Sequence, residues 1–436
     1  MRQQLKKFIE AIGKDSIAII PAAHEVTRSY DTEFKFHQDP DFRYLTGFPE
    51  PDAIAVISPS SKKAPYTLYV RPRDETMEIW YGRRQGVDGA KKNYKADKAV
   101  SIDKFEQDFA KLVNGHEKLY YRFGVDAKLD QIVLKYLSIQ RHGRLKTPYP
   151  PHTIIDPTII IHEMRLHKTP EEAELMQKSA DIACEAHVLA MQNCQVGMNE
   201  SQIESIIEHH FRMSGAEGVA YNSIIGGGDN ATILHYVENN QVLKDGDLLL
   251  IDAGANYQGY SSDITRTFPV NGKYSKPQRE IYDVVLEVQL ALCEATKVGM
   301  TNKKRQDTAI EMLVDGMLRI GLMKGKAKEI IKKKSYMKYY MHGLGHYLGL
   351  DVHDAGKYFT DAKAKNSRPF EPGVCLTVEP GIYVSPDDKS APAKFRGIGI
   401  RIEDDVLVTA DGNINLTKNV PKHPDEIEDI MAKAKK

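Results

Sequence analysis

Two aspartates in the segment IDAGANYQGYSSDITRTF are the first residues whose types and spacing suggest chemistry. Asp252 ends an aliphatic run at 248–251, and Asp263 lies eleven residues later within a second strand-like run. Glycines between the runs allow the chain to reverse, so we expect the two carboxylates to face each other across an antiparallel pair. Two unpaired carboxylates in apolar surroundings repel each other and lose hydration. A divalent cation would neutralise them, whereas the alternative is two surface aspartates in a turn.

Three histidines form a second cluster, in the segment MHGLGHYLGLDVHD. His342 and His346 have the spacing of the helical zinc motif, but the glutamate that follows the first histidine of that motif is absent. The interspersed glycines also disfavour a stable helix. We therefore exclude a zincin and expect a glycine-rich loop that brings His342, His346 and His353 towards a site. The alternative is three buried structural histidines.

Two glutamates complete the set, Glu379 in LTVEPGIY and Glu403 in GIGIRIEDDVLV. Each belongs to an apolar, β-rich run, where an unpaired ionised carboxylate is costly. For Glu379 the alternative is a strand end that faces solvent, because Pro-Gly follows it and favours a turn. For Glu403 the alternative is an ion pair with Arg401.

The charges of these residues suggest one shared site. Four carboxylates and one neutral imidazole match the charge of two divalent cations. The donors are hard and rich in oxygen, and none is a cysteine, which favours Mn²⁺, Co²⁺ or Fe²⁺ over a structural zinc ion. Two metal ions about 3.5–4 Å apart can hold a bridging hydroxide, lower its pKa and polarise a carbonyl, as amide hydrolysis requires.

The elements that must position these residues fall into two regions. Short apolar runs such as 53–57 and 66–70 alternate with helical stretches up to about residue 155, which indicates an α/β domain. Prolines at 148, 150 and 151 interrupt this pattern. We therefore expect an N-terminal domain at 1–160 and a catalytic domain at 161–436.

The second region has a repeated pattern. Thr169, Pro170 and Glu172 predict a helix start, a second helix is expected at 199–213, and strands are expected at 248–255 and 261–268. Ser275, Pro277 and Gln278 then predict another helix start, followed by a helix through 308–320 and strands at 374–378 and 399–408. The break Val196-Gly197-Met198-Asn199 is repeated as Val298-Gly299-Met300-Thr301. This predicts an internal pseudo-twofold duplication with one site between two similar halves.

The overall composition excludes several classes of protein. Basic and acidic residues number 60 each, so net charge gives no reason to expect nucleic acid or a membrane surface as a partner. No segment approaches the roughly 20 apolar residues of a membrane helix. Lys6, Lys7 and Glu10 interrupt any signal-peptide-like run. The four cysteines show no CxxC spacing, as is typical of reduced thiols, so we expect a cytoplasmic protein.

Together these segments resemble the pita-bread metallopeptidases, a family that includes Xaa-Pro aminopeptidase (aminopeptidase P), prolidase, methionine aminopeptidase and the metal-free creatinase. The resemblance covers nearly the whole chain and includes IIGGGDNATILHYVEN as well as the segments above. DTEFKFHQDPDFRYLTGFPEPDAIAVI and MEIWYGRRQG resemble the creatinase-type N-terminal domain of the proline-specific members. This implies an α/β N-terminal domain, an α+β pita-bread catalytic domain and cleavage of the N-terminal Xaa-Pro bond.

The resemblance also implies roles for individual residues. Asp252 and Glu403 would bridge two metal ions, most simply Mn²⁺, with Asp263 completing one site and His346 and Glu379 the other. A bridging hydroxide would attack the carbonyl, and Glu379 would carry the proton to the leaving nitrogen. The remaining residues would act on the substrate: His235 and His353 at the proline pocket or the tetrahedral intermediate, His342 and Arg401 behind the ligands or on the substrate, and Tyr383 as a further substrate-binding candidate.

Two alternatives remain open from the sequence. A prolidase would prefer dipeptides and anchor their free carboxylate. A non-catalytic peptide-binding module would be expected to lack some of the metal ligands, and all five are present here. By resemblance, the expected partners are peptides with proline at the second position and further copies of the chain in a homodimer or homotetramer.

Overall fold

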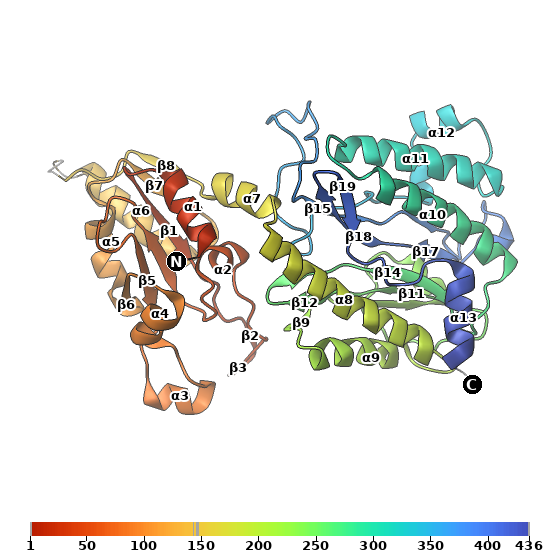
Figure 1. Ribbon diagram of the computed structural model, residues 1–436, viewed down its shortest axis with the longest axis horizontal. Helices are drawn as coiled ribbons and strands as arrows, with labels where there is room; N and C mark the ends of the chain where they lie inside the picture. Colours follow the sequence, from red (N-terminus) through yellow and green to blue (C-terminus); the bar gives the residue numbers. More distant parts are fainter. Residues whose placement is uncertain (1, 143, 145–147, 435–436) are drawn as a thin grey trace. The chain divides into compact units, whose positions relative to one another are not determined.

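The computed structural model describes residues 2–142, 144 and 148–434. The chain divides into two compact units, Met1–Met164 and Arg165–Lys436 (Figure 1). Helix α7 (Thr158–Leu166) contains the point of division. Among the helices of the described residues, none is both long and apolar enough to cross a membrane.

The first unit is built on a mixed six-stranded sheet with the order β6-β5-β4-β1-β7-β8. Strand β4 runs antiparallel to β1 and β5, while the β5–β6, β1–β7 and β7–β8 pairs are parallel. The strands are β1 (Ser16–Pro21), β4 (Ile54–Ile57), β5 (Tyr66–Val70), β6 (Lys98–Ser101), β7 (Lys118–Tyr120) and β8 (Thr153–Ile155). The runs at 53–57 and 66–70 are therefore strands, as the sequence predicts.

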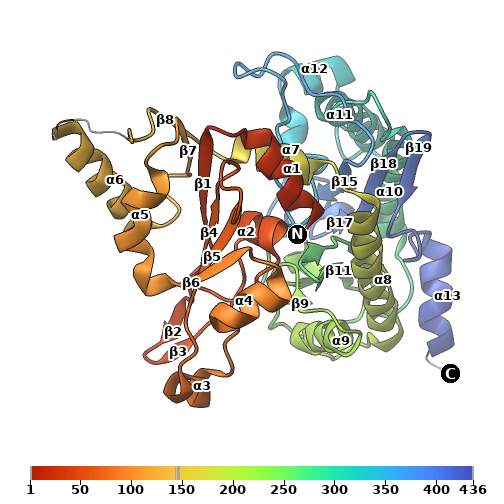
Figure 2. The same cartoon turned by 60° about the vertical axis from the view of Figure 1, so that its left-hand side comes forward.

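Helices cover both faces of this sheet, which gives the α/β architecture. Figure 2 shows α5 (Phe105–Val113) and α6 (Ala127–His142) on one side and α1 (Gln3–Ile12) and α2 (Pro40–Thr46) on the other. Phe105, Phe109 and Val133 pack from α5 and α6 against Ile17 and Val56 of the sheet, all buried. This unit also contains β2 (Thr27–Ser29), β3 (Thr32–Glu33), α3 (Glu75–Tyr81) and α4 (Gly86–Tyr94).

The second unit opens with two helices that begin at capping boxes. Helix α8 (Pro170–Asn193) begins after Thr169, whose hydroxyl accepts from the N–H of Glu172, while the Glu172 carboxylate accepts from the N–H of Thr169. Helix α9 (Glu200–Met213) begins after Asn199 in the same manner. An antiparallel sheet of β10 (Ile224–Gly227), β11 (Leu248–Asp252) and β14 (Thr265–Pro269) follows. A smaller sheet contains β9 (Gly218–Val219), β12 (Ala255–Tyr257) and β13 (Tyr260–Ser261).

The same order of elements then recurs. Helix α10 (Lys276–Ala295) begins at a capping box formed by Ser275 and Gln278, and α11 (Asn302–Arg319) begins after Thr301. Figure 1 shows α8 beside α9 and α10 beside α11. The second antiparallel sheet contains β15 (Cys375–Val378), β18 (Asp404–Thr409) and β19 (Gly412–Asn415), and β16 (Gly381–Tyr383) pairs with β17 (Gly399–Arg401). The remaining helices are α12 (Ala327–Lys332) and α13 (Pro424–Ala434).

The repeated four-residue breaks have matching structures in the two halves. Gly197 and Gly299 both adopt positive φ, 91° and 81°, which glycine tolerates at no steric cost. The N–H of Gly197 donates to Leu243 and the N–H of Gly299 donates to Phe370, both at main-chain oxygens. The equivalent backbone pairing confirms the internal duplication that the sequence predicts.

The strands that carry the acidic residues are shorter than predicted, and each ends near a candidate ligand. Strand β11 ends at Asp252, Asp263 lies between β13 and β14, and Glu403 lies between β17 and β18. The cross-strand partner of Asp252 is Thr265, so the expected direct pairing of Asp252 with Asp263 is wrong. Asp252 and Glu403 both pair with Thr265, Asp252 in the sheet and Glu403 in an isolated antiparallel bridge, while Asp263 lies two residues before it. The carboxylates can therefore converge without being cross-strand neighbours.

Candidate metal centre

A cavity of about 650 Å³ lies in the second unit, where the breaks in its strands meet. The five residues predicted as metal ligands all line it, together with four of the predicted catalytic and substrate residues: Asp252, Asp263, His346, Glu379 and Glu403, with His235, His342, His353 and Arg401. The apolar residues that line it include Ile224, Leu234, Val237 and Val352. Tyr383 is not among the described residues that line it.

The two aspartates share one hydroxyl group. The Tyr221 hydroxyl lies 2.6 Å from Asp252 Oδ1 and 2.5 Å from Asp263 Oδ1. A phenol carries a single proton, so it donates to only one of these oxygens at a time. Burial raises the pKa of Asp252, Arg401 opposes this, and Asp263 adds to it. A bound cation that neutralises both carboxylates fits this arrangement.

Glu403 is the most deeply buried of the acidic residues in the cavity, with 1% of its surface exposed. Its Oε2 accepts a 2.6 Å hydrogen bond from the Thr265 hydroxyl. Burial, followed by the charges of Asp263, Glu379 and Asp252, holds the pKa of Glu403 well above its usual range. The ionised form therefore requires a compensating positive charge.

Arg401 supplies only part of that charge, and not by the direct ion pair considered for Glu403. Its Nη2 lies 2.6 Å from Asp252 Oδ2, and its Nε donates to Thr265 Oγ1 at 3.1 Å. Arg401 thus reaches Glu403 through the Thr265 hydroxyl. The simple ion-pair alternative is replaced by a bridged contact, which leaves the Glu403 carboxylate directed at the cavity.

His346 has the orientation that a metal ligand needs. Its Nδ1 lies 3.0 Å from the main-chain oxygen of Tyr347, a contact that places a proton on Nδ1 and leaves Nε2 as the ring nitrogen that faces the carboxylates. Nε2 lies 3.3 Å from Asp263 Oδ2 and 3.7 Å from Glu379 Oε1. Burial lowers the pKa of His346, but the Asp263 and Glu379 carboxylates outweigh it and raise the value to about 9. The carboxylates thus attract a positive charge to this nitrogen, whether a proton or a metal ion.

The donor atoms are close enough to bind an ion in common. One atom each from Asp263, His346 and Glu403 lies within 4.8 Å of the others. Carboxylate oxygens and an imidazole nitrogen are ligands that Mn²⁺, Co²⁺, Fe²⁺ and Zn²⁺ accept. The chemistry of this donor set therefore fits a metal centre.

Glu379 lies at the more open edge of the cluster, with 18% of its side chain exposed. Its Oε1 accepts from the Thr377 hydroxyl at 3.3 Å. Burial raises the pKa of Glu379. The positive charge of His346 acts against this rise and the negative charge of Asp263 adds to it, which brings the pKa to about 7. A carboxyl group with a pKa near neutrality can both accept and release a proton.

A chain of polar contacts runs from Asp252 through Arg401 and Tyr383 to His342. Tyr383 is 2% exposed, and its hydroxyl lies 3.0 Å from Arg401 Nη1 and 2.9 Å from His342 Nε2. Burial lowers the pKa of His342 to about 4, helped by Arg401. The His342 ring is therefore neutral at pH 7 and is oriented by Tyr383, which lies behind the cavity residues.

The other two histidines present their rings to the cavity. The His353 ring packs edge-on against His346, with centroids 4.2 Å apart and planes at 71°. Burial lowers the pKa of His353, followed by the charge of His346. His235 lines the cavity together with its sequence neighbour Leu234 and with Val237.

Sequence reasoning missed several residues that hold the ligands. Tyr221 and Thr265 make the contacts described above, and Asp405 Oδ2 accepts from the N–H of Asp263 at 3.0 Å. The run Glu-Asp-Asp at 403–405 within an apolar strand could have indicated Asp405, because three adjacent acids there require partners. Tyr221 and Thr265 carry no comparable signal.

Comparisons with known proteins agree along the whole chain. The model of metallopeptidase family M24 matches residues 174–410, and the model of the aminopeptidase P N-terminal domain matches residues 1–121. The Xaa-Pro aminopeptidase of Escherichia coli strain K12 is 43% identical, covering 100% of this chain and 98% of that protein. Human Xaa-Pro aminopeptidase 3 is 35% identical, covering 97% of this chain and 82% of that protein.

Solved structures show the same agreement. Pseudomonas aeruginosa aminopeptidase PepP has a TM-score of 0.95 at 40% identity, covering 99% of this chain and 97% of that one. Zinc-substituted E. coli aminopeptidase P in complex with product has a TM-score of 0.95 at 43% identity, covering 100% of this chain and 99% of that one.

Proposed function

The chain belongs to metallopeptidase family M24, and we propose that it acts as an Xaa-Pro aminopeptidase, which hydrolyses the bond between the first residue of a peptide and a proline in second position. The observation that carries the proposal is the convergence of the five candidate ligands on one cavity of a chain that matches such enzymes over its full length. The pita-bread fold expected from the sequence is confirmed by these structural matches.

We further propose that Asp252, Asp263, His346, Glu379 and Glu403 hold two divalent cations, most simply Mn²⁺. Their carboxylate oxygens and His346 Nε2 would be the donor atoms. Asp263 Oδ2 lies 3.3 Å from His346 Nε2, whereas Asp252 Oδ2 is engaged by Arg401. When bound, such ions lower the pKa of a water molecule and attract the charge that develops on the carbonyl oxygen.

The residues of the chain would then divide the remaining work. Water adds its oxygen to the carbonyl carbon, the C–N bond breaks, and Glu379 moves the proton of that water to the proline nitrogen. His235 and His353 border the space next to the metal ligands, where they would contact the proline ring or the developing oxyanion. His342 and Arg401 would bind or orient the substrate, and the predicted contribution of Tyr383 would pass through these two residues, because its hydroxyl contacts both.

Four further expectations from the sequence belong to the same proposal. We assign residues 1–160 to an N-terminal domain and 161–436 to the catalytic domain, with support from the two compact units and the two family models. Assembly as a homodimer or homotetramer and a cytoplasmic location remain predictions.

Selectivity for proline tests the proposed activity directly. A tertiary Xaa-Pro amide has no N–H, and its ring is compact and apolar, so a pocket shaped for it places the carbonyl accurately. Because a displacement of 1 Å can cost about 10²-fold in rate, we expect kcat/KM for an Xaa-Ala-Xaa peptide to be lower by about that factor.

His353→Ala should reduce turnover of the proline peptide without emptying the metal centre.

Matched peptides separate the alternatives. We would measure kcat/KM on Xaa-Pro-Xaa, Xaa-Ala-Xaa and the free Xaa-Pro dipeptide by release of the first residue. Preference for the dipeptide would identify a prolidase, and binding without turnover would identify a peptide-binding module. Equal rates on the proline and alanine peptides would remove the proline-specific label but leave a metallopeptidase.

Removal of metal is expected to abolish turnover and to lower the melting temperature. Ions that bind only the folded state stabilise it by RT ln(1 + [L]/Kd), about 2.7 kcal/mol at a hundredfold excess over Kd. We would treat the protein with a chelator, follow activity and thermal unfolding, and then restore Mn²⁺ or Co²⁺. Full turnover by exhaustively metal-free protein would contradict the proposed metal chemistry.

A further inference from the structure

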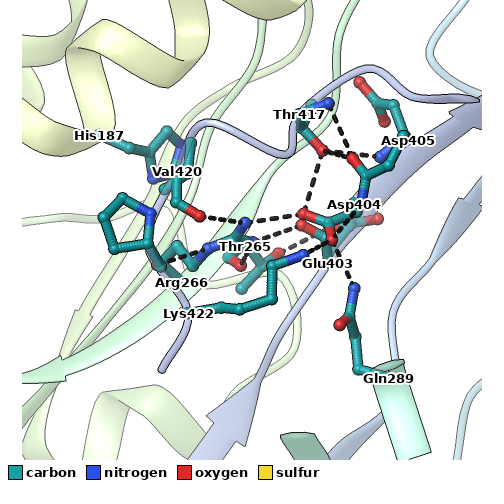
Figure 3. A network of polar contacts seen from close by, with 12 residues as sticks. His187, Thr265, Arg266, Gln289, Glu403, Asp404, Asp405, Thr417, Val420 and Lys422 are labelled. Atoms are coloured by element: carbon teal, nitrogen blue, oxygen red, sulfur yellow. Dashed lines mark hydrogen bonds and ion pairs between the residues drawn. The ribbon is translucent and has the colours of Figure 1, made fainter. Parts of the chain in front are cut away.

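A buried ionic cluster adjoins Glu403. Its members are not among the described residues that line the cavity. Figure 3 shows Arg266, Gln289, Thr417 and Lys422 converging on Asp404. Asp404 accepts from Arg266 Nη2 at 2.7 Å, from Gln289 at 2.7 Å and from Thr417 at 3.0 Å, and it also pairs with Lys422. Arg266 and Asp404 are both 0% exposed. Both oxygens of the carboxylate thus accept hydrogen bonds, and one of them holds Nη2 of Arg266.

The other donors of Arg266 reach main-chain oxygens. Nη1 donates to the oxygen of Glu403 at 2.6 Å and to that of Thr265 at 2.9 Å. Nε and Nη2 donate to the oxygens of Pro421 and Val420, each at 3.1 Å. One guanidinium group therefore joins the backbone at the metal centre to a segment near the C-terminus.

Thr265 and Glu403 are also joined to each other. The N–H of Glu403 donates to the Thr265 oxygen at 3.1 Å, and the Thr265 hydroxyl donates to the Glu403 carboxylate at 2.6 Å. Glu403 lies between β17 and β18, where it forms an isolated antiparallel bridge with Thr265. A buried main-chain oxygen without a donor is costly, and Arg266 supplies that donor.

Arginine suits this position because its five N–H groups form a rigid planar fork. A lysine could keep the charge opposite Asp404, but its single ammonium group cannot span the oxygens of Glu403, Thr265, Val420 and Pro421 together. The contribution of Arg266 to Glu403 is therefore one of geometry in addition to charge.

We propose that Arg266 is a positioning residue for Glu403. By clamping the main chain of Glu403 and Thr265 against Asp404, it holds the Glu403 carboxylate in the direction that metal binding requires. This inference rests on the proposed function, because it assigns Glu403 to the metal centre.

The test compares Arg266→Lys with Lys422→Met. Both substitutions alter the ionic contacts of Asp404. Within the part of the chain that the structure describes, Lys422 makes no hydrogen bond to Glu403 or Thr265. Arg266→Lys keeps the charge and loses the fork. Loss of a residue that orients a metal ligand typically weakens metal binding by about 10–100-fold, and we expect a rise of that size in the Mn²⁺ dissociation constant for Arg266→Lys.

Lys422→Met should lower the melting temperature of the metal-free protein without weakening Mn²⁺ binding, because removal of a nearby positive charge does not oppose the binding of a cation. We would measure the dissociation constant and stoichiometry for Mn²⁺ by calorimetric titration, the Mn²⁺ signal by electron paramagnetic resonance, and unfolding in chelator. For Arg266→Lys, kcat should fall more than KM rises, because the substrate contacts remain.

Each outcome decides between the inference and a purely structural role. An Arg266→Lys protein that binds Mn²⁺ as tightly as wild type overturns the inference and leaves the proposed function intact. If the wild type binds neither Mn²⁺ nor Co²⁺ nor Zn²⁺, the inference and the proposed metal chemistry are both overturned. If Arg266→Lys does not fold, Arg266→Gln combined with Asp404→Asn removes the two charges as a pair, and a wild-type dissociation constant in that protein equally overturns the inference.

Discussion

Replacement of Glu403 by alanine is expected to reduce turnover by more than about 10³-fold, which exceeds the usual cost of removing one oxyanion-hole donor. Glu403 contributes a donor atom to the group that it forms with Asp263 and His346, within 4.8 Å of theirs. Alanine removes this metal-binding carboxylate. It also leaves the Thr265 hydroxyl without the oxygen that accepts its hydrogen bond. Metal content should therefore fall together with the rate.

The stability of the same variant separates a metal ligand from a structural carboxylate. Burial and the neighbouring carboxylates hold the pKa of Glu403 well above its usual range, so the ionised group is unfavourable in the metal-free folded protein. We expect the metal-free Glu403→Ala protein to melt no lower than the metal-free wild type, while the stabilisation on adding Mn²⁺ is largely lost. A structural carboxylate would give the opposite pattern.

Elemental analysis, kcat and thermal unfolding with and without Mn²⁺ would provide the measurements. Glu208→Ala is a suitable control, because Glu208 is a half-buried glutamate of α9 whose pKa is also raised by burial, and it lies outside the described lining of the cavity. Wild-type metal content and rate in Glu403→Ala would contradict the assignment.

The parts of this protein that could be predicted from the sequence are those that depend on local chemistry. Thr169 with Glu172 and Ser275 with Gln278 define helix starts within four residues, and the structure has capping boxes at both. The candidate ligands were visible because an acidic residue in an apolar run needs a partner, whatever the fold. Both signals are contained within a short segment.

The parts that could not be predicted depend on contacts between distant segments. The pairing of Asp252 with Thr265 follows from how β11 and β14 align, which the intervening glycines do not determine. In the sequence, Arg266 resembles any other polar residue of a strand. Its role becomes visible only in the structure, where residues 403–404 and 420–422 lie against it. The resemblance implies a substrate-binding role for Tyr383, whereas its buried position behind Arg401 and His342 depends on the pairing of β16 with β17.

Replacement of Glu379 by glutamine is expected to lower kcat by about 10²–10⁴-fold, the usual contribution of a positioned proton-transfer group. Glutamine keeps the size of the side chain and one oxygen that can face the metal centre, but it cannot take up and release the proton. Oε1 of Glu379 lies 3.7 Å from His346 Nε2 and accepts from Thr377, contacts that the amide oxygen can retain. Metal content should thus stay closer to wild type than in Glu403→Ala.

The decisive comparison is between rate and metal within one sample. The ratio of kcat to bound metal should fall sharply in Glu379→Gln, whereas in Glu403→Ala rate and metal should be lost together. Glu371→Gln, at an exposed glutamate on the same segment, controls for the loss of one negative charge. Turnover of Glu379→Gln at the wild-type rate would exclude the proton-transfer role. If Glu379→Gln instead loses metal as completely as Glu403→Ala, the main role of Glu379 is that of a metal ligand. The carboxyl group with a pKa near 7 would then act by holding the ion and not by moving the proton.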